Sequence, residues 1–160
     1  MLLMLKYALL SATVLMLVAL GGCFSEHSGV INLALEGIMV ICGLVGTMAL
    51  NLLPADMANV WKVTISICLS AAAGVLYSSL LAFSAINLKA DQTIGGTALN
   101  LLSTAIALVV AKRYNGSQSA KLSYDNSPFI FQIGGLTVNV FLIIGLVLLA
   151  VSIVLLYKTR

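Results

Sequence analysis

Charged side chains are scarce in this sequence. Only 8% of its 160 residues are Asp, Glu, Lys or Arg, whereas a soluble domain carries roughly a quarter. Hydrophobic residues make up 61% of the chain, and its mean hydropathy is +1.14. A soluble domain of this length buries only about 70% of its unfolded surface, so the remaining apolar area would aggregate in water. The composition excludes a soluble domain and indicates that the solvent is a lipid bilayer.

Clusters of basic residues and of metal ligands are also lacking. The eight basic residues are scattered between apolar runs, so no nucleic-acid partner is expected. The cysteines Cys23, Cys42 and Cys68 lie far apart, and His27 is the single histidine. We therefore predict neither a disulfide nor a metal site. Because phosphate-loop, zinc-protease and serine-hydrolase motifs are absent, we expect no catalytic residue, no cofactor and no enzyme activity.

Long apolar runs, in contrast, recur along the chain. A transmembrane helix needs about 20 mostly apolar residues to cross about 30 Å of hydrocarbon. Five segments meet or approach this length: residues 7–24, 30–53, 60–86, 94–111 and 138–157. Residues 128–138 (PFIFQIGGLTV) are a candidate for a sixth, short or re-entrant element. The prediction is an all-α, polytopic transmembrane helix bundle of five or six spans that forms one domain over residues 1–160.

The end of the first run offers two interpretations. Residues 20–23 (LGGC) match the processing site of a secreted lipoprotein, which would be cleaved before Cys23. Such a mature chain would still contain four apolar runs, whereas a lipid-anchored secreted protein is normally soluble apart from its acyl groups. We interpret the run as a membrane span and keep the lipoprotein as an alternative. Ser28 is then expected to cap the second helix ahead of Val30.

Small residues recur at helical spacing in the third run, where a low ridge allows another helix to pack closely. The predicted helix-packing residues are Ser70, Gly74, Ser78 and Ala82.

Polar residues enter the second predicted span. If its helix starts at Ser28, Glu36 lies about 12 Å along the axis, and Asn32 lies one turn earlier on the same face. An ionised carboxylate facing lipid is costly, so we expect Glu36 to face a bundle interior or a water-filled cavity. Glu36 then either lines a solute pathway, or is a structural residue bonded to a neighbouring helix or placed near the headgroups.

The fourth predicted span also has a narrow polar face, on which residues step by four. Gln92 lies one turn before Gly96, and Asn100 and Thr104 follow. The adjacent glycines at residues 95–96 permit a close backbone approach or a break beside a cavity. Ordinary helix crossing at glycine is the alternative.

Two blocks of sequence resemble a known family. Residues 25–40 (SEHSGVINLALEGIMV) and 88–102 (LKADQTIGGTALNLL) are similar to the permease subunits of bacterial ABC importers for simple sugars and nucleosides, the ribose/galactoside type. The first block matches S-E-x-S-G-V-x-N-x-x-L-E-G-x-M at Ser25, Glu26, Ser28, Gly29, Val30, Asn32, Leu35, Glu36, Gly37 and Met39. The second matches A-D-Q-x-x-x-G-x-A-L-N at Ala90, Asp91, Gln92, Gly96, Ala98, Leu99 and Asn100.

The resemblance covers only the N-terminal half of such a permease, so a truncated or partial chain is expected. It implies a multi-pass protein of the bacterial inner or plasma membrane that forms part of the translocation pathway for a sugar or nucleoside. The implied partners are a second permease subunit, cytoplasmic ABC ATPase subunits and an extracytoplasmic solute-binding lipoprotein. The candidate pathway residues, chosen for their polarity within spans, are Asn32, Glu36, Gln92 and Asn100. The competing hypothesis is a structural or partner-binding membrane protein without a pathway.

Overall fold

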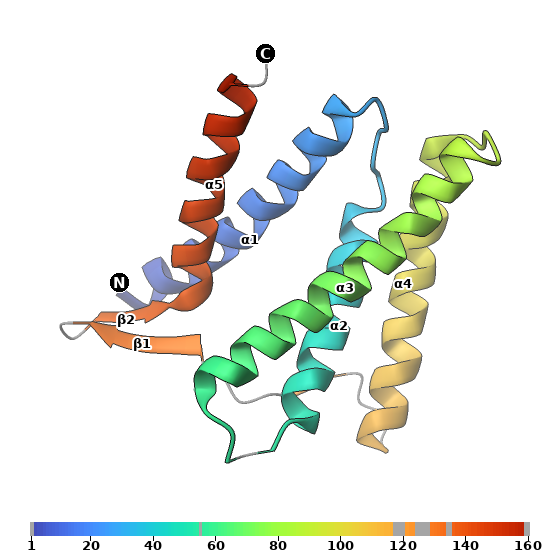
Figure 1. Ribbon diagram of the computed structural model, residues 1–160. Helices are drawn as coiled ribbons and strands as arrows, with labels where there is room; N and C mark the ends of the chain where they lie inside the picture. Colours follow the sequence, from blue (N-terminus) through green and yellow to red (C-terminus); the bar gives the residue numbers. More distant parts are fainter. Residues whose placement is uncertain (1, 55, 117–120, 124–128, 134–135, 159–160) are drawn as a thin grey trace.

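The computed structural model describes residues 2–54, 56–116, 121–123, 129–133 and 136–158. These residues form five α-helices and one β-hairpin (Figure 1). In chain order the elements are α1 (Leu2–His27), α2 (Leu35–Leu52), α3 (Asn59–Ile86), α4 (Gln92–Asn115), β1 (Ile130–Ile133), β2 (Leu136–Asn139) and α5 (Val140–Lys158). The predicted helical transmembrane bundle is confirmed, with a short hairpin added.

The helices have the length and surface that a bilayer requires. Four stretches are long and apolar enough to cross a membrane: Tyr7–His27, Leu35–Leu52, Asn59–Ile86 and Gln92–Asn115. The apolar stretch of α5, Val140–Leu155, is shorter. Large hydrophobic side chains point outward, and Leu76 and Leu101 are 71% and 75% exposed. Helices suit this environment because they satisfy their own backbone hydrogen bonds without water.

The sixth span is replaced by the hairpin. β1 pairs antiparallel with β2, with Ile130 opposite Asn139 and Ile133 opposite Leu136. Four extended residues cover only about 13 Å, less than half of the hydrocarbon core. The hairpin therefore does not cross the membrane, and α5 follows it directly at Val140. Residues 128, 134 and 135 of the expected element lie outside the described residues.

The start of the second helix was predicted wrongly. Gly29 has a φ of 81°, and the backbone N–H of Gly29 donates to Glu26 while that of Val30 donates to Ser25. This pair of bonds is the Schellman motif that ends a helix. Ser28 therefore directly follows the last residue of α1 as its C-terminal cap, its hydroxyl donating to the Ser25 carbonyl at 2.7 Å, and it does not cap α2. Residues 30–34 form a non-helical linker before α2 begins at Leu35.

The helices form two packing groups, which are side by side in Figure 1. The three-helix group comprises α2, α3 and α4, which pack against one another. The two-helix group comprises α1 and α5, which pack mainly against each other, with a smaller contact between α1 and α2. Cys23, the candidate lipoprotein cysteine, lies within α1 and is exposed.

The predicted small-residue ridge of α3 contacts α2 at its first two positions. Ser70 Oγ donates to the Cys42 carbonyl at 3.1 Å, and a Cβ at Gly74 would lie 2.7 Å from Cys42 Sγ. Ser78 is half-buried and bonds to Val75 in its own helix. Ala82 is exposed. The contact with α2 instead continues one turn back along α3, through Ser66.

Candidate functional site

The N-terminus of α4 is capped locally. Asp91 directly precedes the helix, and its carboxylate accepts hydrogen bonds from the backbone N–H groups of Thr93 at 2.7 Å and Ile94 at 3.3 Å. These bonds stabilise the ionised form, so they hold the pKa of Asp91 below its ordinary value. The cap gives α4 a defined start from which Gln92 and Asn100 reach the linker that precedes α2.

The N-terminus of α2 is capped from a different helix. The cap residue Ala34 has no side chain that can bond to the first turn, so the free N–H groups of that turn need other acceptors. Asn100 supplies one: its Oδ1 accepts from Gly37 N–H at 2.7 Å. The same side chain donates from Nδ2 to the Leu33 carbonyl at 2.8 Å. Asn100 therefore holds both the linker and the first turn of α2 on α4.

Gln92 and Asn32 complete the same arrangement. Gln92 Oε1 accepts from the backbone N–H of Ile31 at 2.8 Å. Asn32 Oδ1 accepts from Ala34 N–H at 3.0 Å, two residues along. The expectation that Asn32 lies on a helical face with Glu36 is wrong, because Asn32 belongs to the linker.

Glu36 is the second residue of α2, not a residue deep within it. Its side chain is exposed in the first turn, where the helix dipole favours a negative charge. This position near one end of the helix agrees with the alternative that places Glu36 near the headgroups. The expectation that Glu36 lies deep in the helix and faces the interior of the bundle does not hold for the described residues, because its side chain is exposed. The other three predicted pathway residues use their amide groups to bind backbone.

Two glycines allow this contact. A Cβ at Gly96 would lie 2.8 Å from Leu33 Cβ and 3.2 Å from the Ala34 nitrogen. A Cβ at Gly37 would lie 2.8 Å from Asn100 Oδ1. Helix α4 is continuous through residues 95–96. Gly96 and Gly37 therefore let the linker and α2 approach α4 closely, and no break in α4 occurs at residues 95–96.

Tyr77 is a polar contact that the sequence interpretation did not single out. Its hydroxyl donates to the Leu99 carbonyl of α4 at 2.6 Å, and its side chain is only 8% exposed. Ser103, fully buried, donates to the Asn100 carbonyl at 2.7 Å. The sequence did offer a signal for this contact, namely the tyrosine hydroxyl within an apolar run, three residues after Gly74. Tyr77 joins α3 to α4 at Leu99, the residue before Asn100.

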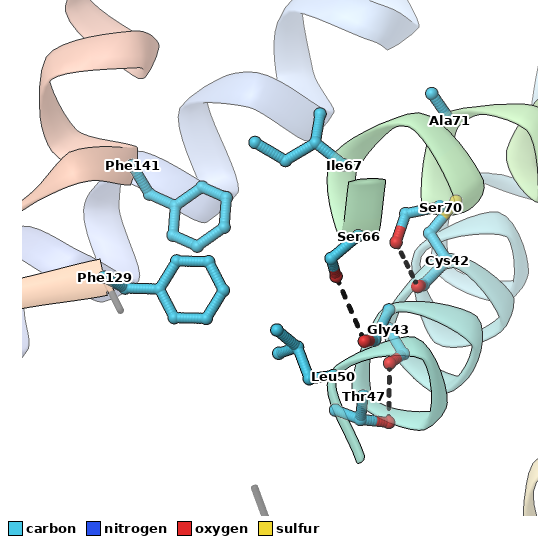
Figure 2. Close-up of a pocket in the computed structure, with 11 residues that line it drawn as sticks. Cys42, Gly43, Thr47, Leu50, Ser66, Ile67, Ser70, Ala71, Phe129 and Phe141 are labelled. Atoms are coloured by element: carbon cyan, nitrogen blue, oxygen red, sulfur yellow. Dashed lines mark hydrogen bonds between the residues drawn. The ribbon is translucent and has the colours of Figure 1, made fainter. Parts of the chain in front are cut away.

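A cavity of about 400 Å³ lies elsewhere in the bundle, toward the hairpin. Its walls include Gly43 and Thr47 of α2, Ser66 of α3, and the aromatic rings of Phe129 and Phe141 (Figure 2). The four predicted pathway residues do not line it. Among the residues that the structure describes, no group of three His, Cys, Asp or Glu side chains could hold a metal ion.

Comparison with known proteins decides the family. Residues 4–160 match the family model described as "Branched-chain amino acid transport system / permease component". The chain belongs to this permease family. It is 36% identical over 129 residues to the nucleoside ABC transporter permease protein NupC of Lactococcus lactis subsp. cremoris (strain MG1363). The matched residues make up 78% of this chain and 40% of NupC.

Other relatives of this permease carry related names. The guanosine ABC transporter permease protein NupQ of Bacillus subtilis (strain 168) is 39% identical over 115 residues, which cover 71% of this chain and 36% of NupQ. The putative glucose ABC transporter permease protein TsgC13 of Haloferax volcanii is 38% identical over 96 residues, covering 60% of this chain and 27% of TsgC13. The chain thus spans at most about two fifths of these curated relatives. No solved structure matches it.

Proposed function

We propose that this chain is a membrane-spanning permease component of an ABC importer, forming part of the translocation pathway for a nucleoside or a simple sugar. The observation that carries the proposal is the family match over residues 4–160. The names of the nucleoside, guanosine and glucose permease relatives support the solute class. The relatives are named as permeases, which supports a role in transport for this component.

The proposed importer places residues 1–160 as one transmembrane domain in the inner or plasma membrane of a bacterium. A second permease subunit completes the pathway, and cytoplasmic ABC ATPase subunits drive its alternation between the two sides. An extracytoplasmic solute-binding lipoprotein delivers the solute. These partners come from the ABC transporter names of the relatives and from the resemblance of the two sequence blocks.

Within this proposal the four polar residues divide into two roles. Asn32, Gln92 and Asn100 are positioning residues, because their side-chain oxygens accept hydrogen bonds from the linker and from α2. Glu36 is the pathway residue, because its exposed carboxylate is held at a helix end that the other three define. Since the carboxylate lies at the first turn of α2, it contacts the solute near one side of the bilayer and not at its centre.

Uptake of radiolabelled guanosine and ribose tests the proposal. Cells lacking their own uptake systems receive this chain together with its ATPase, binding-protein and second permease subunits. We expect uptake above that of cells receiving the other subunits alone. Glu36→Gln should abolish most of it at unchanged membrane abundance, because the amide removes the charge at nearly constant shape.

The matched control is Glu26→Gln, which removes a carboxylate that is also exposed, at the end of α1. This variant should transport normally. Wild-type uptake by Glu36→Gln would remove Glu36 from the pathway. Full copurification with the ATPase but no uptake of any solute would favour the alternative, a partner-binding membrane protein without a pathway.

A further inference from the structure

The charged residues are scattered along the chain, but the fold gathers them by sign at the two ends of the helical bundle. Helices α1 and α3 begin at one end, and α2 and α4 finish there, because successive helices run in opposite directions (Figure 1). This end, called the basic end, holds five basic residues and one acidic residue among those that the structure describes: Lys6, Lys62, Lys112, Arg113, Lys121 and Asp56. The opposite end holds three acidic and two basic residues of the described set: Glu26, Glu36, Asp91, Lys89 and Lys158.

Hydrogen bonds place Lys121 at the basic end. Asn115, the last residue of α4, donates from Nδ2 to the Lys121 carbonyl at 2.8 Å. Asn51, near the end of α2, donates from Nδ2 to the Ser123 carbonyl at 3.2 Å. Helix α5 starts from the hairpin and finishes at the opposite end, on the side where α1 finishes (Figure 1). Lys158, its last residue, is therefore counted at the opposite end.

Helix dipoles do not explain this sorting. A dipole favours an anion at the N-terminus of a helix and a cation at its C-terminus, and Glu36 in the first turn of α2 agrees with it. Lys6 and Lys62, however, lie near the N-termini of α1 and α3, and Glu26 lies in the last turn of α1. The charges therefore follow the end of the bundle and not the terminus of each helix, which indicates that the two ends meet different surroundings.

Aromatic residues mark the basic end as a membrane interface. In three helices a basic residue is the direct neighbour of a Tyr or Trp: Lys6 and Tyr7 in α1, Trp61 and Lys62 in α3, and Arg113 and Tyr114 in α4. All three aromatic side chains are exposed. Tyr and Trp are enriched at the level of the lipid headgroups because one part of the ring system is apolar and another is polar. Basic side chains beside them extend their charge to the same level.

The number of basic residues decides which leaflet the basic end meets. Anionic phospholipids give the cytoplasmic leaflet a negative surface potential, which attracts each nearby Lys or Arg. Short cytoplasmic connections accordingly carry an excess of Lys and Arg, whereas Asp and Glu contribute little to orientation. The described residues give five basic residues at the basic end against two at the opposite end. Arg160, which lies outside the described residues, could raise the second number only to three.

We propose that the basic end binds the anionic phospholipid headgroups of the cytoplasmic leaflet. The N-terminus of α1 then lies on the cytoplasmic side, and the linker and the first turn of α2 lie on the extracytoplasmic side. Glu36 therefore stands on the side from which an importer receives its solute. This consequence for Glu36 rests on the proposed permease function, whereas the orientation and the lipid contact do not.

Thiol labelling of the full chain in membrane vesicles tests the orientation. The background carries Cys23→Ala, Cys42→Ala and Cys68→Ala, so that each variant has a single cysteine. His27→Cys places that cysteine at the opposite end, and Asp56→Cys places it at the basic end, where the native side chain is also exposed. A membrane-impermeant maleimide is added to right-side-out or to inside-out vesicles, and labelling after detergent gives the total.

We expect the cysteine at position 27 to be labelled in right-side-out vesicles and the cysteine at position 56 in inside-out vesicles. Detergent should expose both to the same extent. The reverse pattern, or labelling of both positions from one side, would overturn the orientation.

Trp61, the single tryptophan of the chain, reports the lipid contact. The native chain is placed in nanodiscs with equal parts of phosphatidylglycerol, which is anionic, and phosphatidylcholine, which has no net charge. One of the two lipids carries bromine on its acyl chains and quenches tryptophan fluorescence at close range. We expect brominated phosphatidylglycerol to quench Trp61 as if it were enriched about fivefold, the attraction expected of one basic residue at an anionic surface. Salt at about 1 M should reduce this preference, because it screens charges beyond about 3 Å.

The matched control moves the tryptophan to the other end of the bundle. Phe24 is also exposed and lies near the end of α1, so Phe24→Trp combined with Trp61→Phe should show no preference between the two lipids. In the native background, Lys62→Gln should remove most of the preference at Trp61, and Lys62→Arg should retain it because the charge stays.

Equal quenching of Trp61 by the two lipids, or a preference that Lys62→Gln leaves unchanged, would overturn the headgroup contact. A basic end that binds an acidic protein surface instead of lipid would give the first of these results. Neither assay measures transport, so their outcomes are separate from uptake. Guanosine uptake with the reverse labelling pattern would leave the permease function standing and remove Glu36 from the extracytoplasmic side.

Discussion

The three-helix group and the two-helix group are held together differently. In α2, α3 and α4, side chains cross between helices to backbone carbonyls or N–H groups, as Tyr77, Ser66 and Asn100 do. In α1 and α5 the described contact is one of shape: a Cβ at Gly145 would lie 2.5 Å from Thr13 Cγ2. The Thr13 hydroxyl donates to Leu9 within its own helix.

This difference teaches how each group keeps its register. Lipid provides no hydrophobic force between helices, so packing and interhelical hydrogen bonds must hold them together. A hydrogen bond has a preferred direction and distance, whereas a packed apolar face tolerates sliding. We therefore expect the three-helix group to behave as a fixed unit and the two-helix group to shift against it.

The largest effect is expected at Asn100. Replacing it by Ala removes both bonds to the linker and α2 and leaves a backbone N–H and a carbonyl without these partners. The cost should be about 3 kcal/mol in the free energy of unfolding. Unfolding by SDS in mixed micelles measures it. Thr97→Ala is the control, because Thr97 is exposed and its hydroxyl bonds only within α4, and it should change the free energy little.

The neighbouring glycines 95 and 96 test the same contact between α4 and the linker, because substitution of either by Ala adds a single Cβ atom. Gly96→Ala forces a Cβ toward the backbone of the linker and should destabilise by about 1–3 kcal/mol. Gly95→Ala meets only side-chain atoms at 3.5 Å, so it should stabilise by about 0.5–1 kcal/mol through helix propensity. The same SDS titration compares the two. Equal effects would show that the linker does not lie on α4 as described.

The two-helix group can be altered at Gly145. Gly145→Ala brings a Cβ against the Thr13 methyl and should cost about 1–2 kcal/mol. Thr13→Ser removes that methyl and keeps the hydroxyl, so the double variant should regain most of the loss. A crosslink between cysteines placed in α1 and α5 reports the separation of these helices directly. Failure of the rescue would contradict the Gly145–Thr13 contact.

The helical bundle could be predicted from the sequence because a bilayer allows few alternatives. An apolar run of sufficient length must satisfy its backbone internally, so the runs ending near Leu53 and Ile86 led to helices α2 and α3 that end at Leu52 and Ile86. The hairpin was missed because its apolar residues resemble those of a short span. Only the pairing of β1 with β2 separates the two possibilities.

The geometry around Glu36 could not be predicted because its cap comes from another helix. Ser28 resembled a local cap for α2, but Gly29 ends α1 there, and the first turn of α2 takes its acceptor from Asn100, 63 residues away along the chain. No local pattern reveals such a partner. The four polar residues were chosen because polar side chains are unusual within spans, but Asn32 lies in the linker. Three of the four bind backbone, which their residue type alone could not show.

The smallest effect is expected at the cap of α4, where the three-helix group depends on a charge. The pKa of Asp91 is lowered in the folded chain from its ordinary value of 3.8, so the cap contributes its full stability above that value and loses it as the pH falls through the folded pKa. Asp91→Asn keeps an acceptor oxygen that does not titrate. The variant should therefore lose less stability than the parent between about pH 5 and pH 3, as measured by SDS unfolding at each pH. Parallel pH profiles for the two chains would show that the ionised cap contributes nothing to holding α4 in place.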